Sequence, residues 1–377
     1  MSKNILIIAG EPSGDMRGSE LLKELRPLLP GTSFWGVGGD MLSSQGMELF
    51  THIRSFSLVG ISELLTSLFK IRRQFASLKA EAIKRRPSMA ILIDYPGFNL
   101  RMARFLKKNG IPVVYYVVPQ IWAWGEDRVR YIKNHVSLPI TLFRFEKDLL
   151  AKHGIFAEYA GHPLVDMVPD GTLTRDPATP PRTIGLLPGS RTREVENLLP
   201  TMLAACRKIR GNKDVPHILL AKSSNVNAEL YNNIVSTYGT ELRIKEYTDD
   251  AFSCLSDCDI AVVASGTATL ETAMMERPMV IVYKSGFLTY ALFKLFAKVR
   301  DIGLVNVVAG RTVVPELLQN DFTPEKLSRH LLDIINDRGK REAMLAAIRE
   351  VKRSLGEKGA AGRAAKAIAR FAGKDRI

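Results

Sequence analysis

One loop in the second half of the chain carries residue types that suit a diphosphate. In LLPGSRTREVENLLP, a glycine turn, Ser190 and Arg191 directly follow an apolar run. Arginine offers forked donors to a diphosphate, and a hydroxyl with neighbouring backbone amides can complete such a site. We prefer Arg191 to Arg193 for this contact, because Arg193 precedes Glu194 and could pair with it locally. Ser190 as a plain helix cap is the alternative.

A second loop lies in VASGTATLETA, where an apolar run gives way to small residues before a helical pattern resumes. Ser265, Gly266 and Thr267 would let a helix N-terminus come close to an anion or a ribose. Glu271 would lie one turn into that helix, where its carboxylate could accept both ribose hydroxyls. A first-turn glutamate that only complements the helix dipole is an equal alternative at this point.

The first half of the chain supplies further candidates. Asp94 ends the apolar run MAILID and precedes Asn99, so it is placed to act as a general base or, alternatively, to cap a turn and a helix. In AGEPSGD, Glu11 and Ser13 could hold a polar ligand at the start of a helix over 16–29, or the loop could simply cap it. His162 in AGHPLVD sits in an extended turn and could contact a ligand or make a structural hydrogen bond.

Seven apolar runs without alternation indicate strands buried on both faces of parallel sheets: 4–10, 89–94, 112–118, 183–189, 217–221, 259–265 and 279–284. Helical patterns lie between them at 19–29, 99–110, 198–211 and 268–278. This alternation predicts an α/β protein with two Rossmann-like domains that face a central crevice, where a ligand would meet the carboxyl ends of the strands.

The stretch 166–183, dense in Pro, Asp, Gly and Thr, is the best linker in the sequence. We therefore expect an N-terminal domain over 1–168, facing the acceptor and the membrane, and a C-terminal nucleotide-binding domain over 169–350. Residues 351–377 are expected to form basic helices that pack on their own domain, cross back to the first domain or exchange with a second subunit. A homodimer is left open.

The charge and cysteine content limit the function classes. The chain has 53 Lys and Arg against 39 Asp and Glu, a net charge of +14, which favours an anionic partner such as nucleic acid, anionic lipid or a phosphorylated substrate. It has no zinc-finger or RNP-type signature of nucleic-acid binding. Three cysteines without CxxC spacing are expected to be buried thiols in a cytoplasmic protein. The first apolar run is too short for a signal peptide or a membrane span.

Taken in order, six motifs closely resemble those of the lipid-A-disaccharide synthases, bacterial glycosyltransferases of the GT-B fold. They are AGEPSGD, DYPGFNLRMARFLKKNGIPVVYYVVPQIWAW, GHPLVD, LLPGSRTREVENLLP, ASGTATLETA and LVNVVAGRTVVPELLQ. The resemblance implies an inverting transfer from UDP-2,3-diacylglucosamine to 2,3-diacylglucosamine 1-phosphate, which forms a β-1,6-linked disaccharide and releases UDP. It implies no metal or other cofactor, since helix dipoles and arginine stabilise the departing UDP.

The resemblance also implies roles by position. Asp94 matches the base that takes the proton of the acceptor 6-hydroxyl. Ser190 and Arg191 match the diphosphate contacts, and the nucleotide loop would consist of Ser265, Gly266, Thr267 and Glu271. The donor and acceptor pocket would consist of Glu11, Ser13, Asn99, His162, Asn306, Arg311, Glu316 and Gln319.

The chain departs from the family pattern at two places. The family's second acid in Asp-x-Pro-Asp-Phe-Asn is Gly97 here, and Phe-Pro-Phe-Glu reads Phe143-Arg144-Phe145-Glu146. Asp94 is then the only acid of that pair. Two alternatives therefore remain: a GT-B enzyme acting on another UDP-sugar, either a transferase for a soluble acceptor or an epimerase, and a sugar-nucleotide-binding protein without turnover.

A lipid substrate would explain the positive charge. The segment 61–87 begins with Leu64, Leu65, Leu68 and Phe69 and continues with a run of Lys and Arg against one acid, Glu81. An apolar helix face beside a basic one fits peripheral docking at the inner face of the bacterial inner membrane, where the acyl chains of both substrates reside. A helix that buries the same side chains in the core is the alternative.

Overall fold

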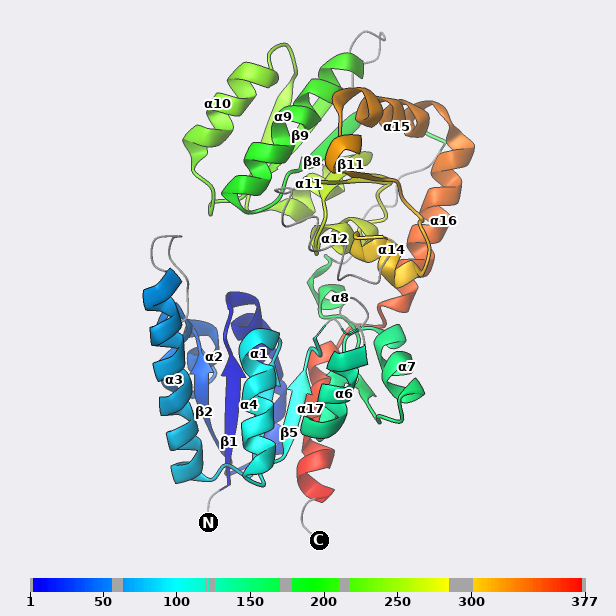
Figure 1. Cartoon of the computed structure of the whole chain (residues 1–377). Coiled ribbons are helices and arrows are strands. Elements are labelled where there is room, and N and C mark those ends of the chain that lie inside the picture. The colour runs from blue at the N-terminus through cyan, green and yellow to red at the C-terminus, as the bar shows by residue number, and fades with distance from the viewer. Residues whose placement is uncertain are drawn as a thin grey trace. The chain divides into compact units, whose positions relative to one another are not determined.

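The computed structural model of the chain describes residues 3–55, 64–119, 121, 126–169, 178–209, 217–284 and 301–374. The chain divides into two compact units, which we call unit 1 (Met1–Asp166 with Glu357–Ile377) and unit 2 (Met167–Gly356) (Figure 1). Each unit is a parallel sheet covered by helices, so the predicted α/β fold class is confirmed. Within the described ranges, no helix is long and apolar enough to cross a membrane.

Unit 1 is built on a seven-stranded parallel sheet in the order β3-β2-β1-β4-β5-β6-β7. The strands are β1 Asn4–Ala9, β2 Ser33–Gly38, β3 Glu48–His52, β4 Met89–Ile93, β5 Val113–Tyr116, β6 Leu138–Thr141 and β7 Glu158–Tyr159. The strand order reverses between β1 and β4. Their carboxyl ends therefore form the topological switch point, where open α/β sheets bind ligands.

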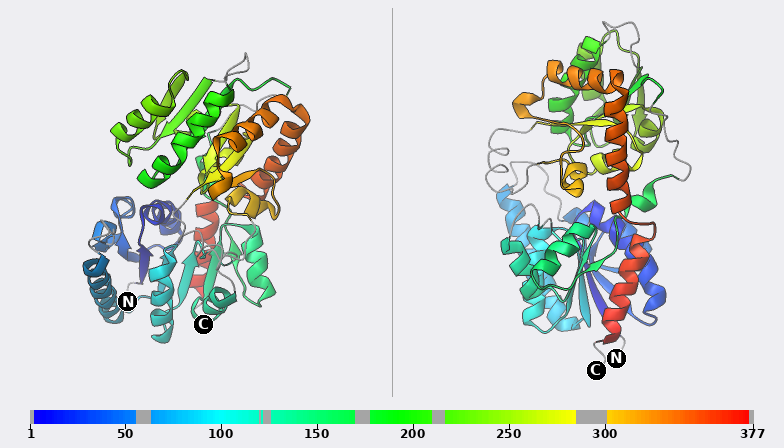
Figure 2. Two further views of the ribbon diagram at one scale, coloured as in Figure 1. Left: turned by 45° about the horizontal axis from the view of Figure 1, so that its top comes forward. Right: turned by 90° about the vertical axis from the view of Figure 1, so that its right-hand side faces the viewer.

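Helices cover both faces of this sheet (Figure 2). They are α1 Pro12–Leu25, α2 Asp40–Ser44, α3 Leu64–Arg85, α4 Pro96–Lys108, α6 Glu126–His135, α7 Arg144–Lys152, α8 Leu164–Met167 and α17 Ala360–Lys374, with 3-10 turns at Arg26–Leu28 and Ile53–Ser55. Helices α3, α4 and α6 share one apolar core with β1, β4 and β5. Helices α1 and α17 pack against each other on the opposite face.

Unit 2 has a six-stranded parallel sheet in the order β10-β9-β8-β11-β12-β13. Its strands are β8 Thr183–Leu187, β9 His217–Lys222, β10 Ile244–Thr248, β11 Ile260–Ala264, β12 Met279–Tyr283 and β13 Glu316–Leu318. Its helices are α9 Thr192–Ile209, α10 Ala228–Tyr238, α11 Ala251–Asp257, α12 Ala268–Met274, α14 Leu304–Ala309, α15 Pro324–Asn336 and α16 Arg338–Ser354, with a 3-10 turn at Gln319–Asp321. Helices α9, α10 and α15 share one core with the sheet.

The end of the chain returns to unit 1, which is the crossing-back alternative of the sequence analysis. The carboxylate of Asp166 accepts the backbone N–H groups of Gly359 (2.6 Å) and Ala360 (3.2 Å), and so caps α17. Arg363 of α17 donates from Nε to the carbonyl of Ala160 (2.7 Å). Helix α16 stays in unit 2, so the basic tail is divided between the units.

The three cysteines are buried and free, as expected. Burial raises the pKa of Cys206 to about 12, so this thiol stays neutral and unreactive at physiological pH.

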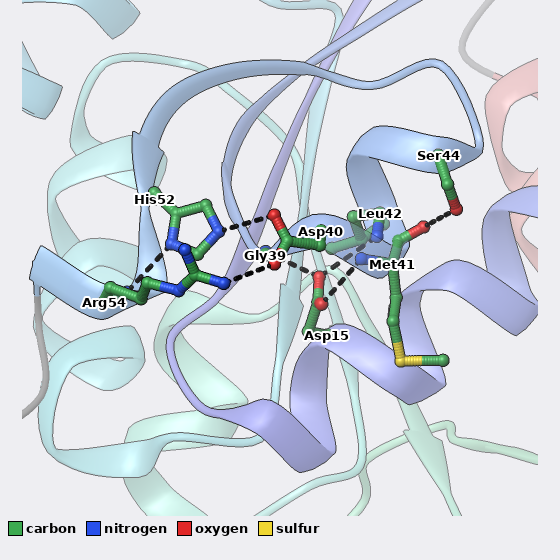
Figure 3. A network of polar contacts seen from close by, with 8 residues as sticks. All are labelled: Asp15, Gly39, Asp40, Met41, Leu42, Ser44, His52 and Arg54. Carbon is green, nitrogen blue, oxygen red and sulfur yellow. Dashed lines mark hydrogen bonds and ion pairs between the residues drawn. The ribbon is translucent and has the colours of Figure 1, made fainter.

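Asp15 joins α1 to the loop after β2 (Figure 3). Its carboxylate accepts backbone N–H groups from Gly39 (2.6 Å), Met41 (3.1 Å) and Leu42 (3.1 Å), and the residue is 4% exposed. Asp15 therefore caps α2 rather than its own helix, which begins at Pro12, earlier than predicted. A Cβ at position 39 would lie 2.5 Å from Asp15 Oδ2, so only glycine lets the carboxylate approach.

We expect Asp15→Ala to lower the free energy of unfolding by about 2–4 kcal/mol, because it leaves buried N–H groups without an acceptor. Asp15→Asn keeps one acceptor oxygen and should lose about half as much. Urea unfolding followed by circular dichroism measures both. An Asp15→Ala protein as stable as the wild type would show that solvent can satisfy these amides.

Candidate active site

The carboxyl end of β4 has a strained backbone. Asp94 and Tyr95 both adopt left-handed conformations, with φ of 48° and 49°. Such a conformation costs a residue other than glycine about 1–2 kcal/mol. Strain of this kind persists only where the surroundings enforce it, and it is concentrated at functional sites.

The carboxylate of Asp94 is held at both oxygens. Oδ1 accepts the N–H of Tyr95 (2.9 Å), and Oδ2 lies 3.3 Å from Nη1 of Arg17 on α1. The Asp94 side chain is 31% exposed and that of Arg17 is 14% exposed. The group is thus oriented but still accessible. Sequence reasoning missed Arg17, because an arginine within an amphipathic helix carries no signal of its own.

Asn99 connects the ends of β1 and β4. It is fully buried, and its Nδ2 donates to the carbonyls of Ile8 (3.4 Å), Ile93 (3.1 Å) and Asp94 (2.8 Å). These bonds fix the strand ends on which Asp94 stands. A direct contact between Asn99 and a ligand stays a prediction.

Two more predicted residues lie beside this strand end. Glu11 and Ser13 are exposed at the start of α1. Burial, and then the charge of Glu11, raise the pKa of Tyr95, which places Glu11 near that ring. A Cβ on Gly10 would lie 2.2 Å from the Tyr95 ring, so the loops after β1 and β4 touch here. Ligand contacts of Glu11 and Ser13 stay predictions.

Gly97 occupies open space at the first turn of α4. A Cβ at this position would meet no heavy atom within 4 Å in the described structure. The backbone thus has room for the second acid that the resemblance led us to expect, but this chain has glycine there.

His162 is buried and neutral. The N–H of Leu164 donates to Nδ1 (3.2 Å), so the proton of the neutral ring is on Nε2, and the ring packs 5.2 Å from that of Phe143. Burial, helped by the charge of Arg17, lowers the pKa of His162 to about 4. The ring can therefore offer Nε2–H as a donor at neutral pH. Its contact with a ligand stays a prediction.

In unit 2, the loop after β8 is held by Glu194 of α9. The Glu194 carboxylate accepts the N–H of Ser190 (3.2 Å) and pairs with Nη1 of Arg191 (2.8 Å). Arg191 was preferred to Arg193 because Arg193 could pair with Glu194, but in the structure it is Arg191 that pairs with Glu194. The Arg191 side chain is 82% exposed. Gly189, at φ 103°, leaves space for the carboxylate, since a Cβ there would lie 2.3 Å from Glu194 Oε2.

The loop after β11 runs as predicted into α12. The Ser265 hydroxyl donates to the carbonyl of Ile302 (3.1 Å), and Thr267 is the N-cap residue. Glu271 lies one turn into the helix and is half-buried. Within the described part of the chain its carboxylate has no hydrogen bond or ion pair, and burial raises its pKa. A partly desolvated carboxylate of this kind is available to a ligand hydroxyl.

Asn306 and Glu316 are engaged with each other and with the surrounding loops. Asn306 Nδ2 donates to Glu316 Oε1 (2.8 Å) and to the carbonyl of Val314 (2.9 Å). The Glu316 carboxylate also accepts the N–H groups of Ile302 and Gly303, each at 2.9 Å. These bonds stabilise the loops around both side chains. A direct contact of either side chain with the sugar donor stays a prediction.

The remaining predicted residues are less constrained. Arg311 makes an exposed ion pair with Glu350 (3.1 Å), and Gln319 follows β13 with a left-handed φ of 52°. The side chains of the predicted membrane-facing set, Leu64, Leu65, Leu68 and Phe69, lie outside the described part of the structure, although their backbone belongs to α3.

Comparison with known proteins identifies the family to which the chain belongs. The family model described as lipid-A-disaccharide synthetase matches residues 5–370. The chain belongs to the lipid-A-disaccharide synthase family. The synthase of Myxococcus xanthus is 39% identical over 374 residues, covering 97% of this chain and 96% of that protein. Lipid-A-disaccharide synthase 1 of Legionella pneumophila (strain Philadelphia 1) is 34% identical, covering 94% of each.

Solved structures agree on the fold. MurG of Acinetobacter baumannii has a TM-score of 0.62 at 13% identity, covering 99% of this chain and 100% of that chain. The UDP-GlcNAc 2-epimerase of Neisseria meningitidis has a TM-score of 0.61 at 11% identity, covering 98% and 100%. This member of the lipid-A-disaccharide synthase family has the GT-B fold. It is a UDP-sugar glycosyltransferase of lipid A biosynthesis, with a UDP-sugar donor and a lipid acceptor.

The lowered pKa of His162 predicts acid sensitivity. Because the folded pKa lies below the unfolded value, stability is complete above about pH 6.5 and is lost as pH falls toward 4. Between about pH 7 and pH 4.5, protonation of this histidine in the unfolded chain should lower the free energy of unfolding by about 2–3 kcal/mol. His162→Asn, which keeps an acceptor for Leu164, should flatten the pH dependence of urea unfolding by that amount. His153→Asn is the control, and equal slopes for the two variants would contradict the assignment.

Proposed function

We propose that Asp94 is the general base in the transfer of diacylglucosamine from UDP to the 6-hydroxyl of 2,3-diacylglucosamine 1-phosphate. The acceptor oxygen attacks the anomeric carbon as the bond to the UDP phosphate breaks, and Asp94 takes the hydroxyl proton. Attack opposite the leaving group inverts the anomeric centre and gives the β-1,6 linkage. The oriented, accessible carboxylate of Asp94 at the end of β4 is the observation that carries this proposal.

UDP is assigned to the loops of unit 2. Among the described residues, Arg191 contacts Glu194 through Nη1, so its other nitrogens can face a diphosphate. Ser190 and the loop of Ser265, Gly266 and Thr267 supply hydroxyl and backbone donors. Glu271, with no partner of its own in the described structure, accepts the ribose hydroxyls. Arginine and backbone donors stabilise the departing UDP, so the proposal uses no cofactor.

The test measures UDP release from purified protein with the diacylated donor and acceptor in mixed micelles. Asp94→Asn should lower kcat by about 10²–10⁴-fold, because the base is removed, and leave the UDP dissociation constant unchanged. Arg191→Ala should weaken UDP binding about ten- to hundredfold. Glu271→Gln should also weaken UDP binding while raising the melting temperature of the free protein, since a partly desolvated charge is removed.

Arg193→Ala is the matched control, because Arg193 is an exposed arginine in the first turn of α9, two residues after Arg191. Normal turnover by Asp94→Asn would remove Asp94 as the base. Tight UDP binding by a wild-type protein that never releases UDP from the donor would instead favour the binding protein without turnover.

Membrane docking is the second part of the proposal. Helix α4 exposes Arg101, Arg104, Lys107 and Lys108, and the described part of α3 exposes Arg72 and Arg73. Lys79 of α3 lies over the rings of Phe75 (4.5 Å) and Phe105 (4.7 Å), which joins the two helices. We propose that this basic face, with Leu64, Leu65, Leu68 and Phe69, docks on the anionic cytoplasmic leaflet that holds both substrates.

Arg101→Glu with Arg104→Glu should lower binding to anionic vesicles at least tenfold, because each cation near such a surface contributes about 1 kcal/mol. Flotation with phosphatidylglycerol vesicles, and with neutral vesicles for comparison, measures this. Arg207→Glu with Arg243→Glu, an equal charge change on exposed residues of unit 2, is the control. Equal losses for both pairs would show that net charge, not this face, governs binding.

A further inference from the structure

Two buried side chains converge on one carbonyl, that of Asp94. The Tyr115 hydroxyl donates to it at 2.8 Å, and Asn99 Nδ2 donates to the same oxygen at 2.8 Å. Both donor residues are fully buried. A carbonyl oxygen has two lone pairs, so this acceptor is saturated.

The same peptide group reaches the carboxylate. Its carbonyl is that of Asp94, and its N–H, that of Tyr95, donates to Asp94 Oδ1 at 2.9 Å. A chain of hydrogen bonds therefore runs from Tyr115 through the peptide plane to the carboxylate oxygen. Fixing the carbonyl fixes the direction of the N–H, and bonds in such a chain polarise one another.

The peptide group between Asp94 and Tyr95 needs this anchor because both residues are in the left-handed region. Without an anchor on the carbonyl, the peptide plane could rotate toward a less strained conformation. That rotation would turn the N–H away from Oδ1 and leave only the Arg17 contact to orient the carboxylate.

We propose that Tyr115 is a positioning residue for the carboxylate of Asp94. The inference rests on the proposed role of Asp94 as the base. Tyr115 contributes no group to the reaction. It maintains the backbone geometry that aims the carboxylate, so its hydroxyl should affect turnover and not nucleotide binding.

The chain offers a matched control at the next position. Side chains alternate along a strand, so Tyr116 points to the face opposite Tyr115. Tyr116 is equally buried, and its hydroxyl has no hydrogen-bond partner among the described residues. Tyr115→Phe and Tyr116→Phe thus remove the same atom from neighbouring buried rings of β5, but only the first removes a bond to Asp94.

The experiment compares the two variants in the UDP-release assay, well below their melting temperatures. Each rate is divided by the concentration of UDP-binding sites, so that unfolded protein is not counted. Tyr115→Phe should lower kcat about ten- to hundredfold, since a displacement of about 1 Å can cost about a hundredfold in rate. Its UDP dissociation constant should stay within about twofold of wild type, as should both constants of Tyr116→Phe. In an Asp94→Asn background, Tyr115→Phe should lower kcat by less than about twofold, because nothing remains to be aimed.

The outcomes separate the two claims. An active wild type in which Tyr115→Phe and Tyr116→Phe turn over equally overturns the inference and leaves the proposed function intact. An additive loss in the Asp94→Asn background also overturns it, because Tyr115 would then act independently of Asp94. An inactive wild type, or an active Asp94→Asn, refutes the proposed function itself. A lower melting temperature of Tyr115→Phe with unchanged kcat would show a purely structural hydroxyl.

Discussion

In a parallel sheet that helices cover on both faces, polar side chains can reach a ligand only from the ends of the strands. Apart from the half-buried Asn4 at the start of β1, the residues of β1, β4 and β5 are buried, so groups that must reach a ligand cannot lie on these strands. They stand in the loops that follow, and the left-handed residues Asp94, Tyr95 and Val117 come directly after β4 and β5. For a β-branched residue such as Val117 this conformation is a true outlier. The rigid core beneath is what sustains that strain.

The two units treat their carboxylates in opposite ways. Asp94 is surrounded by donors, so its position is fixed before any substrate arrives. Glu271 is partly desolvated and has no partner in the described structure, so the free protein bears an unfavourable charge that a ligand can relieve. Preorganisation suits a group that must act at one atom. An unsatisfied acceptor suits the contact with the ribose hydroxyls that is proposed for Glu271.

Sequence reasoning succeeded where a continuous apolar run marks a buried strand, and it missed the buried strands β2 (SFWGVG) and β6 (LPIT), which glycine or proline interrupts. All seven apolar runs are strands, because continuous β-branched stretches have few other uses. β10, with the sequence IKEYT, was missed because it is a sheet edge and mostly exposed. The network of Asn306 and Glu316 was equally invisible, since its partners are backbone groups whose positions depend on the loop path. Arg17 and Tyr115 meet Asp94 across 77 and 21 residues, and only the strand order brings them together.

The return of α17 to unit 1 has a consequence for biosynthesis. Asp166 and the residue it caps, Gly359, are 193 positions apart, with all of unit 2 between them. A ribosome therefore completes unit 2 before unit 1 receives its last helix. Until then the side of α1 that α17 will cover lacks its partner. The nascent chain thus carries a half-finished first unit, and chaperone protection would matter most in that interval.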